Sequence, residues 1–424
     1  MSEILYQINP ALRIQRFDEA AVVPRWLYEL DDPAGRVQRL VVSSAMHRLL
    51  GAFESPRPLA WSGQDLLRGG WSDADAPMLR KLLDERCLPA RLLIAQGELS
   101  DESRQAPVQA RRPGYMSLML PVLGVSAVGR LASRLQKVFH PWVMVPAVIV
   151  IVVAMVALMA ALSRDGQFAA LGSRDVLMAI GLGGLGVLLH ELGHAAAAWR
   201  CGARSVSIGV GWYVCFPVAY AELSETWRMT RRQRVLIDVA GIHMQGLWVA
   251  TLMTWHAASG EAVLLVAALS SALSILWNMN PLLRMDGYWL LSDLLGIPNL
   301  REAAKASLAD FVRRRRGRAE HASASRFGPR TTAFVLVYGA LSIVFFAWMI
   351  VAACRYFGDA ALHAIPALAQ RLWSSEWSQM GAADRGLLLG GLCWQLLMVV
   401  VLGRFLLMTL MRGWRNRSMP MRTA

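Results

Sequence analysis

The feature that most constrains this chain is a run of 22 uncharged residues at 141–162, which has no polar face. A helix of that length rises about 33 Å and therefore crosses the ~30 Å hydrocarbon core of a bilayer. A composition of 55% hydrophobic and 17% charged residues also argues against a water-soluble enzyme. We predict a mainly α-helical polytopic membrane protein with about six transmembrane helices. The other five candidate spans are 176–199, 235–256, 262–280, 331–353 and 386–411.

The N-terminal part has a different composition. Residues 1–140 contain 18 Lys/Arg and 15 Asp/Glu, a balance typical of soluble domains. Two strand-like runs flank the turn signal Asp31-Asp-Pro-Ala-Gly35, and three short amphipathic stretches follow. This order predicts a small winged-helix-like α/β domain at 1–100, followed by a linker at 101–140 and a membrane domain at 141–424. Because the first residues do not resemble a signal peptide, we expect this domain to be cytoplasmic.

The charges of the loops predict the orientation in the membrane. If the N-terminal domain is cytoplasmic, the inner loops 200–234, 281–330 and 412–424 carry 20 Lys/Arg, and the outer loops carry five. This is a clear positive-inside bias, and it places both termini in the cytoplasm. The bias accounts for most of the net charge of +14. We therefore expect membrane lipid as a partner and no nucleic acid.

The motif His190-Glu191-Leu-Gly-His194 carries the chemistry. On a helix, residues four apart share a face, so both imidazoles can bind one ion. Zinc prefers such nitrogen ligands, and Glu191 can act as general base on a bound water. The alternative is a pair of buried histidines that hydrogen-bond neighbouring helices. Because two histidines and a glutamate are costly inside a membrane span, we favour a functional site with one catalytic Zn²⁺.

A third zinc ligand is expected at the same depth. Both the second and the fourth span run from outside to inside. His190 and His194 lie in the cytoplasmic third of the second span, and Asp286 follows shortly after the end of the fourth. Asp286-Gly287 alone would be read as a simple turn. Next to the histidine motif, we interpret Asp286 as the third ligand.

The two motifs together resemble the site-2 protease family of intramembrane zinc metalloproteases. The His-Glu-x-x-His within a span is followed about ninety residues later by Asn278-x-x-Pro-x-x-x-x-Asp286-Gly287. The resemblance covers about residues 175–300, and the core of the membrane domain is expected at 176–300. It implies that His190, His194 and Asp286 bind zinc, that Glu191 activates water, and that Asn278 positions substrate or stabilises the oxyanion. The stretch around Phe216 and Tyr220 resembles the membrane-reentrant β segment that lines the substrate path.

A longer string, from Asn280 to Leu300, is similar to a bacterial branch of peptide zinc metalloproteases. That branch implies a location in the inner membrane, peptide maturation or secretion as the context, and a membrane-fusion adaptor as a partner. Its members have an N-terminal peptide-recognition domain, which 1–100 resembles loosely. One motif departs from the family, since Gly241-Ile-His243-Met-Gln245 stands where many members have Gly-Pro-x-x-Asn. His243 and Gln245 are therefore open candidates for substrate positioning.

These observations favour a metalloendopeptidase that hydrolyses a peptide bond of a peptide or membrane-anchored protein near the cytoplasmic membrane face. The alternative is a non-proteolytic zinc-containing component of a peptide export or maturation complex. A metal transporter would need more acidic or histidine residues along a path through the membrane. The spans contain few besides His243 and Asp238, so this class is disfavoured.

Overall fold

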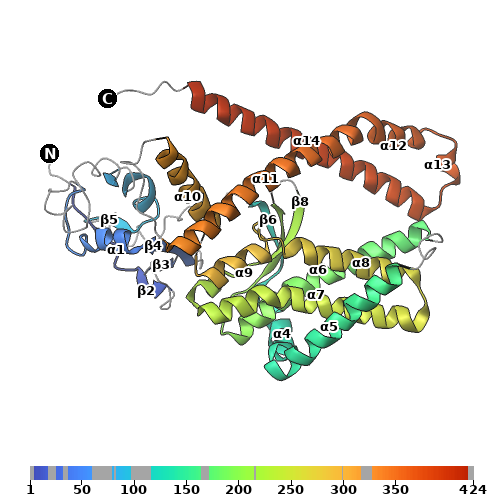
Figure 1. The fold of residues 1–424 in the computed structure, drawn as a ribbon, viewed down its shortest axis with the longest axis horizontal. Coiled ribbons are helices and arrows are strands. Elements are labelled where there is room, and N and C mark those ends of the chain that lie inside the picture. Colours follow the sequence, from blue (N-terminus) through green and yellow to red (C-terminus); the bar gives the residue numbers. More distant parts are fainter. Residues whose placement is uncertain are drawn as a thin grey trace. The chain divides into compact units, whose positions relative to one another are not determined.

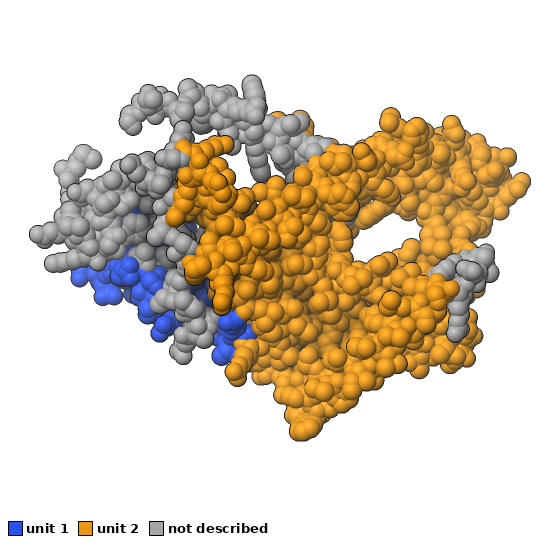
Figure 2. All heavy atoms as spheres, viewed as in Figure 1, with its two compact units in different colours: residues 1–114, 224–231 blue, residues 115–223, 232–424 orange. Residues whose placement is uncertain are grey.

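The computed structural model describes residues 4–17, 25–31, 37–59, 79–80, 83–96, 116–163, 171–213, 216–297, 299–316 and 327–418. The chain divides into two compact units (Figure 2). Unit 1 comprises Met1–Gly114 together with Ser224–Arg231, and unit 2 comprises Tyr115–Leu223 together with Arg232–Ala424. Figure 1 labels the elements of both units.

The described residues of unit 1 form two small sheets, a short α-helix and a π-helical turn (Leu83–Cys87). Strands β2 (Arg13–Phe17), β3 (Arg25–Asp31) and β4 (Val37–Ser43) form one antiparallel sheet, and β1 (Tyr6–Ile8) pairs with β5 (Leu93–Ala95). The predicted hairpin is thus present as β3 and β4, and helix α1 (Ser44–Gly51) follows it. The second of the three predicted amphipathic stretches and part of the third lie outside the described residues. The winged-helix interpretation therefore stays a prediction.

A distant segment of the chain completes unit 1. Residues Ser224–Arg228 form a short 3-10 helix, although their neighbours in the sequence belong to unit 2. Within this segment Arg228 forms an ion pair with the buried carboxylate of Glu29 on β3, with an Nη2–Oε2 distance of 2.6 Å. Trp227 packs against Phe17 at a ring-centroid distance of 6.0 Å. These two contacts hold the segment, which directly precedes helix α7, against strands β2 and β3 of unit 1.

Unit 2 is mostly helical, and its described residues include five helices that are long and apolar enough to cross a membrane. They are α5 (Pro141–Leu162), α6 (Ser173–Arg200), α7 (Arg231–Ser259), the continuous helix Pro329–Leu372, which begins with α11 (Pro329–Asp359) and ends with α12 (Ile365–Leu372), and Ala382–Arg404 of α14 (Ala382–Ser418). The predicted fourth span is α8 (Ala262–Asn278), an apolar helix of 17 residues that rises about 25 Å. The architecture is that of a polytopic helical protein; the number of spans stays a prediction.

Four of these helices share one apolar core. Leu158 of α5, Ala179 of α6, Leu252 of α7 and Leu264 of α8 all belong to the same buried cluster. Close packing of α6 depends on small residues, because a Cβ at Gly193 would lie 2.5 Å from the carbonyl oxygen of Ala240 on α7. This packing brings α7 directly against the half of α6 that carries the histidine motif.

A three-stranded antiparallel sheet in the order β6-β7-β8 also belongs to unit 2. Its strands are β6 (Met116–Leu123), β7 (Ile208–Tyr213) and β8 (Phe216–Ala221). The strand-like interpretation of the stretch after α6 is thus confirmed. Residues 116–139 of the predicted linker form β6, helix α4 (Val125–Leu135) and a short 3-10 helix (Gln136–Phe139), because β6 is apolar and pairs with β7. The exact domain boundaries stay a prediction.

Candidate metal centre and active site

The histidine motif lies in the buried half of α6. His190, Glu191 and His194 have relative exposures of 3%, 8% and 4%, although each carries a strongly polar side chain. The four-residue spacing puts both imidazoles on the same face of the helix, where their rings meet at a centroid distance of 4.8 Å. Such a cluster of buried polar groups within an apolar helix needs partners of matching polarity.

Asp286 supplies the third polar group. It is the first residue of α9 (Asp286–Leu295), eight residues after the end of α8. Its Oδ2 lies 2.7 Å from Nε2 of His190 and 3.3 Å from Nε2 of His194, and the two Nε2 atoms are 3.1 Å apart. Ligands of one tetrahedral zinc ion are about 3.3 Å apart, so the spacing is close to that of a metal site.

The outer nitrogen of each histidine has an acceptor of its own. Nδ1 of His190 lies 3.0 Å from Oε1 of Gln245, and Nδ1 of His194 lies 2.7 Å from the backbone oxygen of Ile237. Both Nδ1 atoms therefore donate a hydrogen, and both Nε2 atoms face Asp286. Outer acceptors of this kind fix the ring orientation of metal-binding histidines.

This arrangement fits a cation. Oδ2 of Asp286 is buried and has no well-oriented hydrogen-bond donor among the described residues, although two Nε2 atoms face it. Burial alone would raise the pKa of Asp286, but the neighbouring imidazoles of His194 and His190 hold it well below its usual range. A metal ion bound among the three atoms would supply a positive partner for this buried carboxylate oxygen. Zn²⁺ suits this set of two nitrogens and one oxygen.

Helix α7 covers the cluster closely. A Cβ at Gly241 would lie 2.3 Å from Nε2 of His194 and 2.6 Å from Nε2 of His190, which is far below van der Waals contact. Only glycine leaves room for the two rings at this point. The buried Arg234 at the start of α7 pairs with Asp293 of α9 at 2.8 Å, so that α7 is also tied to the helix that begins with Asp286.

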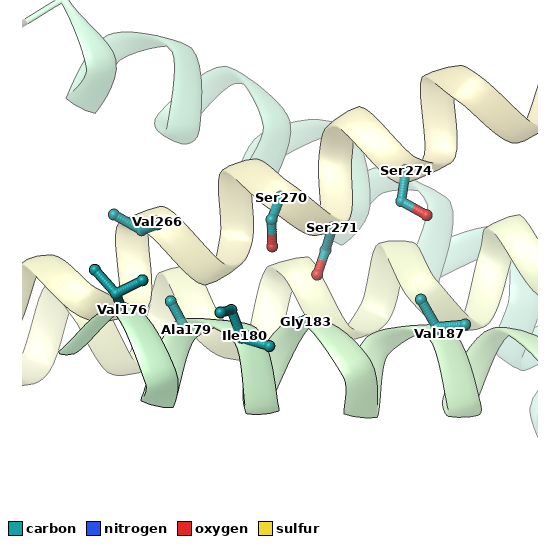
Figure 3. A pocket seen from close by; sticks show the side chains of 9 residues that line it. All are labelled: Val176, Ala179, Ile180, Gly183, Val187, Val266, Ser270, Ser271 and Ser274. Atoms are coloured by element: carbon teal, nitrogen blue, oxygen red, sulfur yellow. The ribbon is translucent and has the colours of Figure 1, made fainter. Parts of the chain in front are cut away.

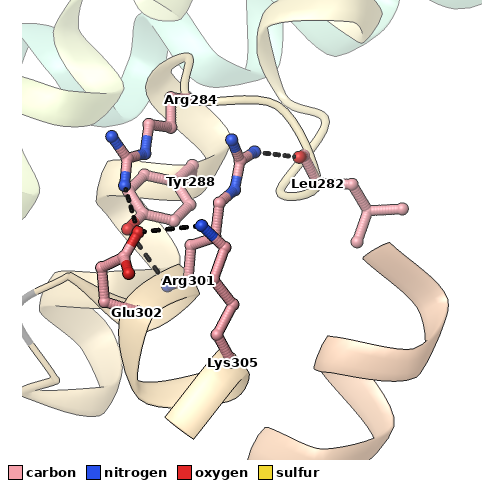
Figure 4. Close-up of polar contacts among 6 residues, drawn as sticks. All are labelled: Leu282, Arg284, Tyr288, Arg301, Glu302 and Lys305. Atoms are coloured by element: carbon pink, nitrogen blue, oxygen red, sulfur yellow. Dashed lines mark hydrogen bonds and ion pairs between the residues drawn. The ribbon is translucent and has the colours of Figure 1, made fainter. Parts of the chain in front are cut away.

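The loop before Asp286 is held from several sides, and Figure 4 shows its residues Leu282 and Arg284 with Arg301 and Glu302, which contact them. Arg301 of helix α10 (Leu300–Arg315) donates to the backbone oxygen of Leu282 at 2.6 Å. The backbone nitrogen of Arg284 donates to the hydroxyl of Tyr213 on β7, and Tyr338 of α11 (Pro329–Asp359) donates to the backbone oxygen of Pro281. These contacts fix the position at which Asp286 enters the cluster.

Glu191 lies beside the cluster of His190, His194 and Asp286. It follows His190 directly, and its carboxylate accepts a hydrogen bond from the backbone N–H of Ala221 at the end of β8. The terminal strand of the sheet is thus connected to the residue next to His190.

The other predicted site residues lie at different distances from this cluster. Gln245 contacts His190 directly, whereas His243 packs against Phe139 at 5.8 Å on another face of α7. Asn278 is half-buried at the end of α8. Tyr220 lies against Gly209 of the neighbouring strand, and the side chain of Phe216 lies outside the described residues. The roles of these five residues stay predictions.

A cavity of about 320 Å³ lies between α6 and α8 (Figure 3). Valine, alanine and isoleucine side chains of α6 face three serines of α8 across it. The serines are Ser270, Ser271 and Ser274. Val187, one of its lining residues, is three positions before His190, but His190, His194 and Asp286 do not line the cavity. The cavity and this cluster are therefore separate, and α6 contributes residues to both.

One curated protein shows significant similarity to part of the chain. Over 117 residues the chain is 31% identical to "Putative peptide zinc metalloprotease protein YydH" of Bacillus subtilis (strain 168). The matched region covers 27% of this chain and 46% of that protein, so the chain spans less than half the length of this relative. No family model and no solved structure matches the chain. At a coarse level, the similarity supports a zinc metalloprotease.

Proposed function

We propose that this chain is an intramembrane zinc metalloprotease of the site-2 protease type. It hydrolyses a peptide bond near the cytoplasmic face of the bacterial inner membrane. The observation that carries the proposal is the convergence of His190, His194 and Asp286 on one point, with Glu191 next to them on the same helix. The partial similarity to a protein named as a peptide zinc metalloprotease supports it.

The proposed chemistry follows from the groups around this point. His190, His194 and Asp286 would hold one zinc ion, which supplies Lewis acidity for a water molecule and for the scissile carbonyl. Glu191 takes the proton of the attacking water and returns it to the leaving amine. The N–H of Ala221 orients the Glu191 carboxylate.

The substrate has to present an extended backbone, since a helix buries its carbonyl groups in internal hydrogen bonds. Strand β8 is a terminal strand of its sheet, and its last residue contacts Glu191. Pairing of an extended peptide with this strand would bring the peptide backbone toward the general base. Phe216 and Tyr220 of β8 and Asn278 of α8 then contact the substrate.

The wider role proposed is peptide maturation, secretion or regulated proteolysis. In this proposal the N-terminal domain recognises a peptide or membrane-anchored protein, and a membrane-fusion adaptor of a secretion system assembles with the chain. Both termini lie in the cytoplasm, as the charge bias of the loops indicates.

The proposal is tested by co-expression of the chain with a short peptide encoded beside its gene. Mass spectrometry of the peptide should detect cleavage with the wild type and none with Glu191→Ala. Equal cleavage with both chains would exclude the proposed mechanism. Another set of results would support the non-proteolytic alternative instead. In that case neither chain cleaves the peptide, a substitution of Asp286 abolishes export of the peptide, and Glu191→Ala still supports export.

A further inference from the structure

The side-chain amide of Gln245 has one satisfied end and one unsatisfied end. Gln245 is fully buried on α7, with a relative exposure of 0%. Its Oε1 accepts a hydrogen bond from Nδ1 of His190 at 3.0 Å. Its Nε2 is buried as well and has no hydrogen-bond partner among the described residues.

The orientation of this amide follows from His190. When Nε2 of His190 binds a metal ion, the hydrogen of the ring is on Nδ1. A rotated Gln245 would place an NH₂ group against this N–H, and two donors would then face each other. The amide oxygen must therefore contact His190, and the NH₂ group is the end that lacks a partner.

An unpaired buried donor is costly, and its position suggests what it binds. A buried donor without an acceptor has lost its hydrogen bonds to water and gained none in exchange. Gln245 lies one helical turn after Gly241, the residue packed against both Nε2 atoms, and its Oε1 contacts Nδ1 of His190, so the amide adjoins the ligand cluster. The acceptor that an extended peptide brings to such a place is a backbone carbonyl oxygen.

We propose that Gln245 has two roles in the reaction, a step that rests on the proposed function. Its Oε1 positions His190 for metal binding, and its Nε2 donates a hydrogen bond to a backbone carbonyl of the peptide substrate next to the scissile bond. Gln245 is thus both a positioning residue for the ligand and a contact for the substrate.

Two substitutions separate these roles. Gln245→Glu keeps an acceptor for His190 but removes the NH₂ group, whereas Gln245→Met has a similar length and offers neither. Thr254→Val is the control, because it removes a hydroxyl nine residues further along α7 that donates to the backbone oxygen of Ala250. Each full-length protein is purified in detergent, its zinc affinity is measured by competition with a chelating dye, and its peptide hydrolysis is measured separately.

We expect Gln245→Glu to bind zinc within about threefold of the wild type and to lose roughly 100-fold in kcat/KM. We expect Gln245→Met to lose 10- to 100-fold in zinc affinity as well. Thr254→Val should match the wild type in both assays. Wild-type hydrolysis by Gln245→Glu would overturn the substrate contact, and wild-type zinc affinity of Gln245→Met would overturn the positioning role. If the wild type hydrolyses no peptide, the proposed function fails and the substrate contact with it, but the zinc affinities still decide the positioning role.

Discussion

Gly241→Ala is the smallest change that should destroy the metal centre without altering a ligand. The added Cβ would lie 2.3 Å from Nε2 of His194 and 2.6 Å from Nε2 of His190. Contact at about 3.5 Å therefore requires movements of roughly 1.2 and 0.9 Å. These are the two atoms proposed to bind zinc, and changes that disturb the orientation of metal ligands typically cost 10- to 100-fold in metal affinity. We expect a loss of about 100-fold in zinc affinity, equivalent to about 2.7 kcal/mol.

The assay is competition for zinc between the purified full-length protein and a chelating dye. Gly184→Ala is the matched control, since it adds the same methyl group to α6 at a point with no atom within 4 Å. The control should bind zinc as the wild type does. Overpacking at Gly241 also lowers stability by about 1–3 kcal/mol, so thermal unfolding of each variant is recorded in parallel. A folded Gly241→Ala protein with zinc affinity within threefold of the wild type would refute the close approach of α7 to the ligands.

Three further predictions concern unit 1. Burial raises the pKa of the Cys87 thiol to about 12, so iodoacetamide at pH 8 should label Cys87 only after denaturation; labelling in the folded chain would contradict its burial. Desolvation lowers the pKa of His47, so the stability that its neutral form contributes is complete above about pH 6.5 and is lost as the pH falls below that value. An NMR titration of the full-length chain should give His47 a pKa below 6.5, and a higher value would refute this. Arg228→Met removes the guanidinium that faces the buried carboxylate of Glu29. It should lower the free energy of local opening of β3, measured by hydrogen exchange, by about 3 kcal/mol. A decrease below about 1 kcal/mol would mean that the ion pair contributes little to the stability of β3.

The sequence predicts those parts of the site that depend on local geometry. Residues four apart on a helix share a face, so the proximity of His190 and His194 follows directly from their spacing. The approach of Asp286 depends on the order and direction of the spans, which the charges of the loops indicate. The structure brings all three residues together, and their binding of zinc stays a prediction.

Other parts of the site have no such signal. The carbonyl of Ile237 and the N–H of Ala221 are backbone groups, which any residue type would supply. Strand β6 pairs with β7, which lies about ninety residues later, so composition alone did not distinguish β6 from a linker. The different surroundings of His243 and Gln245 follow from the helical period, since His243 is two positions, or about 200°, from Gly241, whereas Gln245 is four positions away.

The most direct test of the account measures zinc content and peptide hydrolysis on the same purified samples of the wild type and Glu191→Gln. Because Glu191 is proposed as general base and not as a ligand, both proteins should contain one zinc ion per chain, and only the wild type should cleave the peptide. Absence of zinc from the folded wild type, or equal cleavage by both proteins, would contradict the assignment of His190, His194 and Asp286 as a catalytic zinc site.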